Sequence, residues 1–199
     1  MRRKPRKKSL RCSESEIMGR TLFLIKPDGI ERGLGGEIIK RIEDAGLKIT
    51  AMKMIRVDKD FAEEHYPDTE AQIVGMGTKT LDAARKAGAF EEIKELFGSE
   101  DPREVGLILR ERLVEYLISS PVIAMVIEGD DAVKKIREIS GYTDPAKAKK
   151  GTIRGDFAED SIMSSNREKR AVRNLIHAAG SEEEAEREIM LWFKPEEIY

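Results

Sequence analysis

Runs of apolar residues that suit buried strands recur along the chain, and amphipathic segments lie between them. Four strands are predicted, at Thr21–Ile25, Lys48–Val57, Pro121–Ile127 and Glu188–Phe193. Between them, apolar residues recur at the three- to four-residue spacing of a helix with one buried face. Helices are therefore predicted at about 34–45, 61–66, 78–96, 102–119 and 131–139, and the Ser181–Glu184 capping box predicts the start of another.

The order of these elements is β-α-β-β-α-β with additional helices in residues 68–120. Two βαβ halves in that order form the ferredoxin-like α/β sandwich, a four-stranded antiparallel sheet with helices packed on one face. Residues 140–175 are rich in glycine and show little apolar periodicity, so we expect a long loop there. A loop of that length in a compact domain is usually functional or mobile.

The 199-residue chain has a net charge of −2, but its charges are unevenly distributed. Residues 1–11 hold seven basic side chains and no acidic one, which leaves 29 basic against 38 acidic residues in the remainder. We predict a disordered basic tail at 1–18 and one folded domain at 19–199. Because the body is acidic, nucleic acid would bind at most weakly, through the charge of the tail.

Cys12 is the single cysteine, which excludes an intramolecular disulfide and a cysteine-rich zinc site. No apolar run approaches the roughly 18 residues of a membrane span. No apolar stretch follows the basic tail either, as it would in a signal peptide. We therefore expect a cytoplasmic protein with no membrane partner.

Several polar side chains stand where they could act on a phosphate. His177 precedes the capping box, and a neutral imidazole near a helix N-terminus can serve as a nucleophile toward an anionic group. Glu188, eleven residues on, could orient that imidazole. Arg154 lies in the run Gly151–Phe157 and offers a fork for phosphate oxygens, and Lys26 ends a buried strand. Taken singly, each also has an ordinary interpretation, such as a buried structural histidine or an ion-paired arginine.

Standard nucleotide-binding motifs are missing from the sequence. Neither G-x-G-x-x-G nor G-x-x-x-x-G-K-S/T occurs, and there is no H-E-x-x-H zinc motif. A metal cage made of protein side chains is therefore not expected. Mg²⁺ that arrives with a phosphate ligand needs few protein ligands and is compatible with the sequence.

Seven motifs, in their order along the chain, resemble those of nucleoside diphosphate kinases over about residues 20–67 and 103–195. They are Thr21–Gly29, His65–Tyr66, Pro121–Gly129, Tyr142–Pro145, Gly151–Phe157, Arg173–His177 and Ala185–Phe193. The resemblance implies the ferredoxin-like fold and transfer of a γ-phosphoryl group from a nucleoside triphosphate such as ATP to a nucleoside diphosphate. It also implies a phosphohistidine intermediate and ping-pong kinetics.

The resemblance implies a role for each matching polar residue. His177 would be the nucleophile, and Glu188 would orient it. The transferring phosphate would be surrounded by Lys26, Tyr66, Arg154 and Asn174, and the distal phosphates would be held by Arg137, Thr143 and Arg154. Mg²⁺ would bridge the phosphates, with no metal ligand from protein side chains. The family also implies a homo-oligomer, either a hexamer or a tetramer.

The sequence departs from the family's pattern in several places. Ala179 stands where a serine hydroxyl usually meets the orienting glutamate, which predicts a modest defect in phosphoryl transfer. Segments near 68–102 and 158–170 are predicted insertions, and the phenylalanine that usually stacks on the base has no match. We expect the second insertion to be a polar surface projection. We also expect the insertions to alter the nucleotide lid or the oligomer contacts.

Two other kinds of function remain open at this point. A non-catalytic ferredoxin-like module that binds RNA would need aromatic residues on its central strands, where the candidates are poor. A family member that has become structural or regulatory would have no need to keep His177 together with the basic and amide residues that accompany it.

Overall fold

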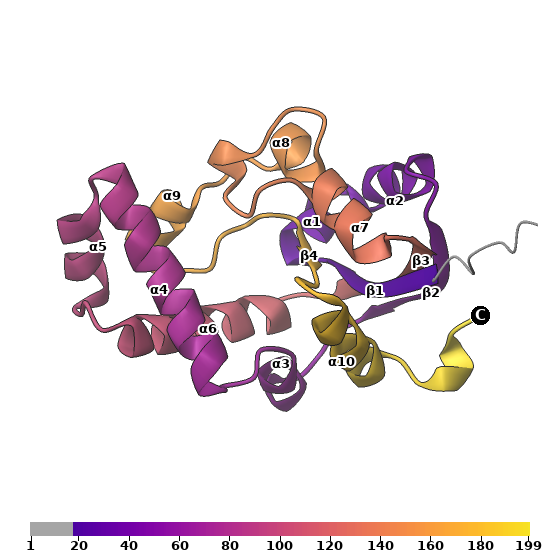
Figure 1. Cartoon of the computed structure of the whole chain (residues 1–199), viewed down its shortest axis with the longest axis horizontal. Coiled ribbons are helices and arrows are strands. Elements are labelled where there is room, and N and C mark those ends of the chain that lie inside the picture. The colour runs from indigo at the N-terminus through magenta and orange to yellow at the C-terminus, as the bar shows by residue number, and fades with distance from the viewer. Residues whose placement is uncertain (1–17) are drawn as a thin grey trace, which may run out of the picture.

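A four-stranded antiparallel sheet lies at the centre of residues 18–199, the part of the chain that the computed structural model describes (Figure 1). Its strand order is β2-β3-β1-β4. The strands are β1 (Met18–Ile25), β2 (Lys48–Ile55), β3 (Val122–Asp130) and β4 (Ile176–Ala178). Most of the predicted basic tail and Cys12 lie outside the described residues. Met18, the last residue of that predicted tail, is the first residue of β1.

The two central strands are apolar on both faces. β1 pairs with β3 along its whole length, from Met18 opposite Asp130 to Ile25 opposite Ile123. Every residue from Leu22 to Ile25 is fully buried, so successive side chains enter two different cores. The continuous apolar runs of β1 and β3 fit this position, because a strand covered on both sides has no polar face.

Helices cover both faces of the sheet, whereas the sequence predicted helices on one face. On one side lie α2 (Gly35–Asp44) and α7 (Ala132–Ser140), the crossover helices of the ferredoxin-like fold. On the other side lie α3 (Lys59–His65), α6 (Pro102–Ile118) and α10 (Glu182–Trp192), which pack around Leu22 and Leu24. The second layer follows from the apolar residues that β1 and β3 present on that face.

The predicted strand at Glu188–Phe193 is wrong, because nearly all of that segment belongs to α10. Ser181 caps this helix, its hydroxyl accepting from the N–H of Glu184 at 3.2 Å. Buried positions Ala185, Glu188 and Trp192 then follow at helical spacing, and this periodicity overrides the strand propensity of the apolar run. The fourth strand is β4, a short strand centred on His177.

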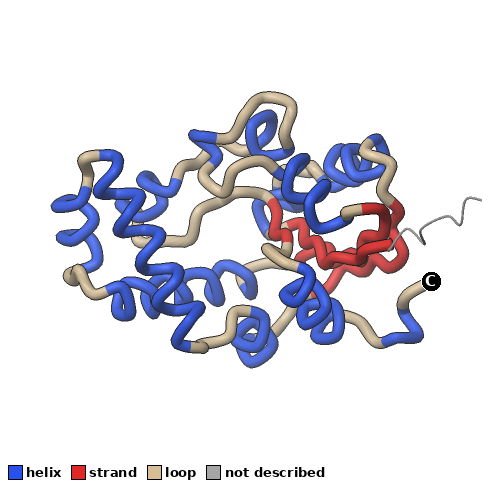
Figure 2. Tube along the Cα trace, in the orientation of Figure 1, coloured by secondary structure: helices blue, strands red, loops and turns tan. Residues whose placement is uncertain are grey.

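A helical arm extends beyond the sheet, as Figures 1 and 2 show. It consists of α4 (Glu70–Ala87), α5 (Phe90–Phe97), α6 and α9 (Ile162–Arg167). The single helix predicted at 78–96 is interrupted by Gly88, whose φ of 69° ends α4 in the left-handed conformation. Two glycines let α4 and α6 approach closely, since a Cβ on Gly77 would lie 1.8 Å from the carbonyl oxygen of Pro102. A Cβ on Gly106 would lie 2.0 Å from the carbonyl oxygen of Ile73.

Residues 140–175 contain more structure than the predicted loop. They include a 3₁₀ turn at Pro145–Lys147, the short helix α8 (Ile153–Phe157) and α9. The expected polar projection at 158–170 is not free in solvent, because Ser165 and Asn166 are buried and Met163 packs against the core of the arm. The remaining short elements are α1 (Pro27–Glu31) and a 3₁₀ turn at Pro195–Glu197. No helix within residues 18–199 is both long enough and apolar enough to cross a membrane.

Candidate active site

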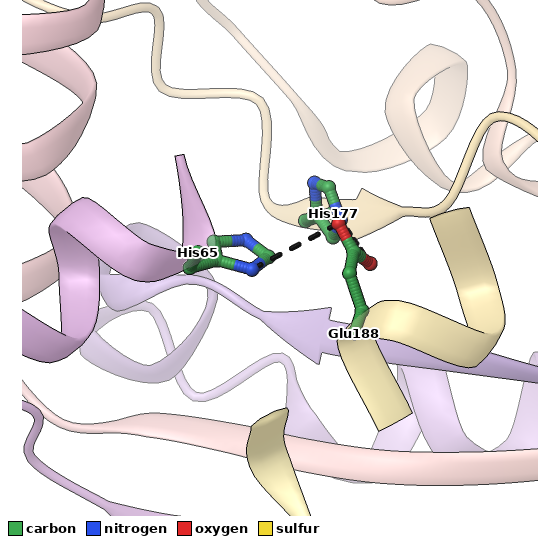
Figure 3. A group of neighbouring side chains, drawn as sticks. All are labelled: His65, His177 and Glu188. Atoms are coloured by element: carbon green, nitrogen blue, oxygen red, sulfur yellow. Dashed lines mark hydrogen bonds and ion pairs between the residues drawn. The ribbon is translucent and has the colours of Figure 1, made fainter. Parts of the chain in front are cut away.

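His177 reaches the site from β4, the edge strand of the sheet. It pairs with Leu24 of β1, so its side chain lies on the face covered by α3 and α10. Figure 3 shows two side chains next to His177: Glu188, which rises from α10, and His65, which comes from the end of α3 and also faces the carboxylate of Glu188. The helices on this face, which the sequence predicted to be uncovered, therefore supply two neighbours of this histidine.

Glu188 holds one ring nitrogen of His177. Nε2 lies 2.9 Å from Oε2 and 3.0 Å from Oε1 of the carboxylate, which is almost completely buried. Burial, followed by the positive charge of Lys26, lowers the pKa of His177, so the ring is neutral. A neutral ring that donates from Nε2 to a carboxylate keeps its lone pair on Nδ1. Burial also raises the pKa of Glu188 to about 7.

His65 packs against both members of this pair. Its ring is 4.6 Å from that of His177 in an edge-to-face arrangement, and its Nδ1 lies 3.8 Å from Oε1 of Glu188. The indole N–H of Trp192 donates to the same Nδ1 at 3.2 Å. Burial lowers the pKa of His65 well below its ordinary value, so this ring is also neutral.

The three side chains His65, His177 and Glu188 have the composition of a metal site, with ligand atoms within 4.8 Å of one another. The hydrogen bond from Trp192 argues against that use, because it occupies the lone pair of Nδ1 and leaves the ring proton on Nε2. Two imidazoles with one carboxylate also suit transition metals better than Mg²⁺. The group is therefore better suited to orienting the imidazole of His177 than to holding a metal ion.

Lys26 and Asn174 form a second buried pair near His177. Lys26 directly follows β1, and its Nζ donates to Oδ1 of Asn174 at 3.0 Å. The amide of Asn174 in turn donates to the backbone carbonyl of Thr143 at 2.9 Å, which is how Thr143 joins the site. Burial and then the charge of Arg154 lower the pKa of Lys26 to about 8.

Arg154 lies at the start of α8, whose first turn is capped by Thr152. The guanidinium donates to three backbone carbonyls, at 2.8 Å to Gly141, 3.2 Å to Asn174 and 3.0 Å to Ile176. An arginine has five N–H donors, so these bonds leave two for a ligand. Burial and then the charge of Arg137 lower the pKa of Arg154 to about 10, and the group stays charged at neutral pH.

The other predicted residues line two neighbouring cavities. One has a volume of about 950 Å³ and contains His177, Glu188 and Tyr66, whose ring is 6.4 Å from that of His177. The other, of about 740 Å³, contains Arg137 with Gly141 and Thr152, and Ser181 borders both cavities. Glu188 contacts the imidazole of His177, and Lys26 and Arg154 lie close enough for their charges to lower its pKa. Asn174 bonds to Lys26, and Arg137 lies next to Gly180 in the smaller cavity.

Comparison with known proteins bears on the chemistry of this arrangement. The family model described as nucleoside diphosphate kinase matches residues 19–107 and 106–198. The nucleoside diphosphate kinase of Pyrobaculum aerophilum is 45% identical over 179 residues, covering 90% of this chain and 97% of that protein. The chain belongs to the nucleoside diphosphate kinase family.

Solved structures agree with this membership. A crystal structure of an NDP kinase from Pyrobaculum aerophilum is similar with a TM-score of 0.85 at 42% identity, covering 91% of this chain and 98% of that one. A nucleoside-diphosphate kinase from Borrelia burgdorferi, solved as a transition state mimic with bound vanadate and ADP, has a TM-score of 0.72 at 34% identity. That match covers 93% of this chain and 92% of the Borrelia chain. The predicted ferredoxin-like fold and phosphotransferase class are confirmed.

Sequence reasoning gave no role to two residues that lie next to this site. Asp28 and Tyr116 bond to each other beneath the turn that carries Asn174. Asp28 lies inside the motif Thr21–Gly29, which was the available signal. Tyr116 lies on an amphipathic helix and was indistinguishable from a packing residue.

Proposed function

We propose that this family member carries the transferred phosphoryl group on Nδ1 of His177. The supporting observation is the 2.9 Å contact between Nε2 and Glu188, which leaves Nδ1 with the lone pair of a neutral ring. In the first half-reaction that lone pair attacks the γ-phosphorus, and the bond to the bridging oxygen breaks. The nucleoside diphosphate leaves with the electron pair, and a second nucleoside diphosphate takes the phosphoryl group back from the ring.

The charge of the His177 ring that faces Glu188 changes during this cycle. The ring becomes cationic when Nδ1 acquires the phosphoryl group, and the carboxylate then faces a positive imidazolium across the same hydrogen bond. The attraction is stronger in the phosphoenzyme than in the free enzyme, because the ring carries a positive charge only there. Burial strengthens it further, since little water screens the two charges. Glu188 therefore orients the nucleophile first and stabilises the charge that develops on it afterwards.

Phosphate binding is assigned to the cations and donors around His177. Lys26, Arg154 and Arg137 bring three positive charges to the site, and burial lowers the pKa of Lys26 and of Arg154. Burial raises the pKa of Tyr66, so its hydroxyl remains a donor. Asn174 and Thr143 complete the set. The nucleotide would enter as its magnesium complex, in which the ion reduces the phosphate charge that these residues must balance.

Labelling tests the assignment directly. Incubation with γ-labelled ATP and Mg²⁺ should give wild-type protein an acid-labile, base-stable label that leaves on addition of nucleoside diphosphate. His177→Ala should carry none. The sequence has two histidines, so His65→Gln is the matched control and should still be labelled. Absence of label from the wild type would contradict the proposal.

The insertion near 68–102 is proposed to contribute to the nucleotide lid. Gln72, Met76 and Lys79 of α4 line the same 950 Å³ cavity as His177. Gln72→Ala and Lys79→Ala should raise the KM for nucleotide with little effect on the rate of phosphohistidine formation at saturation. Equal KM values for wild type and both variants would exclude α4 from the lid.

We also propose that the protein is a homo-oligomer, a hexamer or a tetramer. Met52 and Met54 on the edge strand β2 are 56% and 60% exposed, which is unusual for large apolar residues on a free sheet edge. Measurement of the particle mass in solution decides the oligomeric state, and Met54→Lys should reduce that mass.

Binding of RNA through the tail is a separate possibility. It would appear as salt-sensitive binding that disappears when residues 1–17 are deleted.

A further inference from the structure

The turn that carries Asn174 and His177 into the site has a strained backbone. Leu175 lies between them with a φ of 69°, a left-handed conformation that residues with a Cβ seldom adopt. The N–H of Ile176 donates to the carbonyl of Asn174 at 2.8 Å, which closes a γ-turn around Leu175. Because Leu175 is fully buried, its neighbours must hold this conformation in place.

The segment that follows β1 holds both backbone groups of Leu175. Its N–H donates to Oδ2 of Asp28 at 3.1 Å, and its carbonyl accepts from the N–H of Lys26 at 2.8 Å. Asp28 is 4% exposed, so its carboxylate is removed from water and needs protein partners for both oxygens. The geometry of the turn therefore depends on the rotation of the Asp28 side chain.

Tyr116 of α6 fixes that rotation from the opposite side. Its hydroxyl donates to Oδ1 of Asp28, and the hydroxyl oxygen lies 3.5 Å from the backbone nitrogen of the same residue. Burial, followed by the negative charge of Asp28, raises the pKa of Tyr116, so the phenol keeps its proton. The ring lies 5.7 Å from Nζ of Lys26, close enough for a cation–π contact.

We propose that Tyr116 and Asp28 are positioning residues for phosphoryl transfer, and this inference rests on the function proposed above. Tyr116 orients the Asp28 carboxylate, and the carboxylate holds Leu175 in its left-handed conformation. The turn then sets where Asn174 and His177 stand relative to the phosphate. Through this chain of contacts, α6 of the helical arm helps to place the nucleophile.

Tyr116→Phe is the first test, because it removes one hydroxyl and keeps both the ring under Lys26 and the charge of Asp28. The single-turnover rate of phosphohistidine formation should fall about tenfold, the effect expected for loss of one hydrogen bond to a charged group. The Kd for nucleotide should not change. The pH above which activity declines, which depends on deprotonation of Lys26, should not change either. Rates are expressed per folded molecule, so that a change in stability alone does not alter them.

Asp28→Asn tests the second step and adds a readout. The rate should fall further than in Tyr116→Phe. In the wild type the charge of Asp28 raises the pKa of Lys26, so its removal should move the loss of activity at alkaline pH to lower pH. In this background Leu175→Gly should recover part of the rate, since glycine adopts positive φ without strain. Leu175→Ala is the matched control, because it also shortens the side chain but keeps the Cβ, and it should recover nothing.

The same pair of Leu175 substitutions can be made in the Tyr116→Phe background if Asp28→Asn does not fold. The proposal is overturned if Tyr116→Phe transfers phosphate at the wild-type rate. It is also overturned if glycine and alanine at position 175 give equal rates in either background. Wild-type protein that takes no label at all would instead refute the phosphohistidine itself, so the two failures are distinguishable.

Discussion

The sheet edge that carries His177 and the helical arm are stabilised in opposite ways. At the sheet edge the polar side chains are buried and bonded to one another, as in the contacts of Glu188 with His177 and of Lys26 with Asn174. In the arm the ion pairs within and between the helices lie at the surface, where solvent screens them. Examples are Arg103–Glu70, Lys94–Glu100 and Arg167–Glu92, all with side chains at least 40% exposed.

The difference teaches where this fold is rigid and where it can vary. Buried polar groups that satisfy one another allow a single arrangement, which is what in-line transfer to a nitrogen requires. Exposed ion pairs contribute little each, about 0–1 kcal/mol, and the apolar cluster of the arm is small. The arm is therefore expected to open locally at lower free energy than the sheet. Apart from Tyr116, which bonds to Asp28 from the end of α6, changes to the arm should alter stability and nucleotide affinity more than chemistry.

The largest effect is expected from Glu188→Gln at the sheet edge. The glutamine amide would donate to Nε2 of His177 and hold the ring in the tautomer with its proton on Nδ1. The nucleophilic lone pair would then be lost, and phosphohistidine formation should slow by about 10²–10⁴-fold, the contribution of a well-placed acid–base group. Rapid-quench labelling measures the rate. A fall of less than tenfold would show that the carboxylate does not select the tautomer.

The next largest effect is expected on the stability of the arm. A matched pair of substitutions on α4 tests whether the arm can be destabilised without the sheet. Gly77→Ala drives a Cβ into the carbonyl of Pro102, whereas Gly75→Ala meets nothing within 4 Å. The first should destabilise the arm by about 1–3 kcal/mol through overpacking. The second should stabilise α4 by roughly 0.5–1 kcal/mol, since alanine is the better helix former.

Urea unfolding and amide hydrogen exchange measure both variants. Exchange in Gly77→Ala should accelerate in α4 and α6 and stay near the wild-type rate in β1 and β3. Uniform acceleration across the sheet would mean that the arm and the sheet unfold as one unit, with no difference in local stability between them.

The sheet was largely predictable from the sequence because its signal is local. The runs at Thr21–Ile25 and Pro121–Ile127 are apolar without interruption, and no other element suits them. The error at Glu188–Phe193 arose where two local signals conflicted, a helix cap against a β-prone apolar run. The helical period of Ala185, Glu188 and Trp192 decided the outcome, and that period becomes visible only when a glutamate is counted as buried.

The sequence predicted which candidate residues the fold would bring together, but it did not predict the contacts among them. The seven motifs pointed to His177, Glu188, Lys26 and Asn174, which the fold does bring together. The bonds of Arg154 to three carbonyls could not be predicted, because they depend on where a distant turn places its backbone. The left-handed Leu175 gave no sequence signal at all, since leucine is not a residue that marks such turns.

The pH dependence of the sheet edge gives a smaller and graded effect. The pKa of Lys26 is lowered to about 8, so its positive charge is present below that pH and is lost as the pH rises through it. The kcat/KM for nucleoside triphosphate should therefore decline above about pH 8, by about tenfold per pH unit for one proton. Bound phosphates favour the charged form, so the limb in kcat should lie at higher pH.

Lys26→Arg is the control for this assignment, because the guanidinium stays charged through the same range. Its kcat/KM should start lower, since the fork does not reproduce the bond of the ammonium to Asn174, and it should lose the limb near pH 8. A limb that persists unchanged would belong to a different group.

The smallest effect is expected next to the nucleophile, at Ala179. This residue is fully buried and offers no donor where the family usually has a serine hydroxyl near the orienting glutamate. Ala179→Ser should raise the rate of phosphohistidine formation by a few-fold, about the value of one neutral hydrogen bond. Ala178→Ser is the matched control, because Ala178 packs against the core of α2 and α7 on the opposite face of the sheet, and its rate should not rise. Equal rates for Ala179→Ser and wild type would show that the contacts between Glu188 and His177 already fix the imidazole without a further donor. The sheet edge would then be rigid without the serine, in contrast to the arm with its exposed ion pairs.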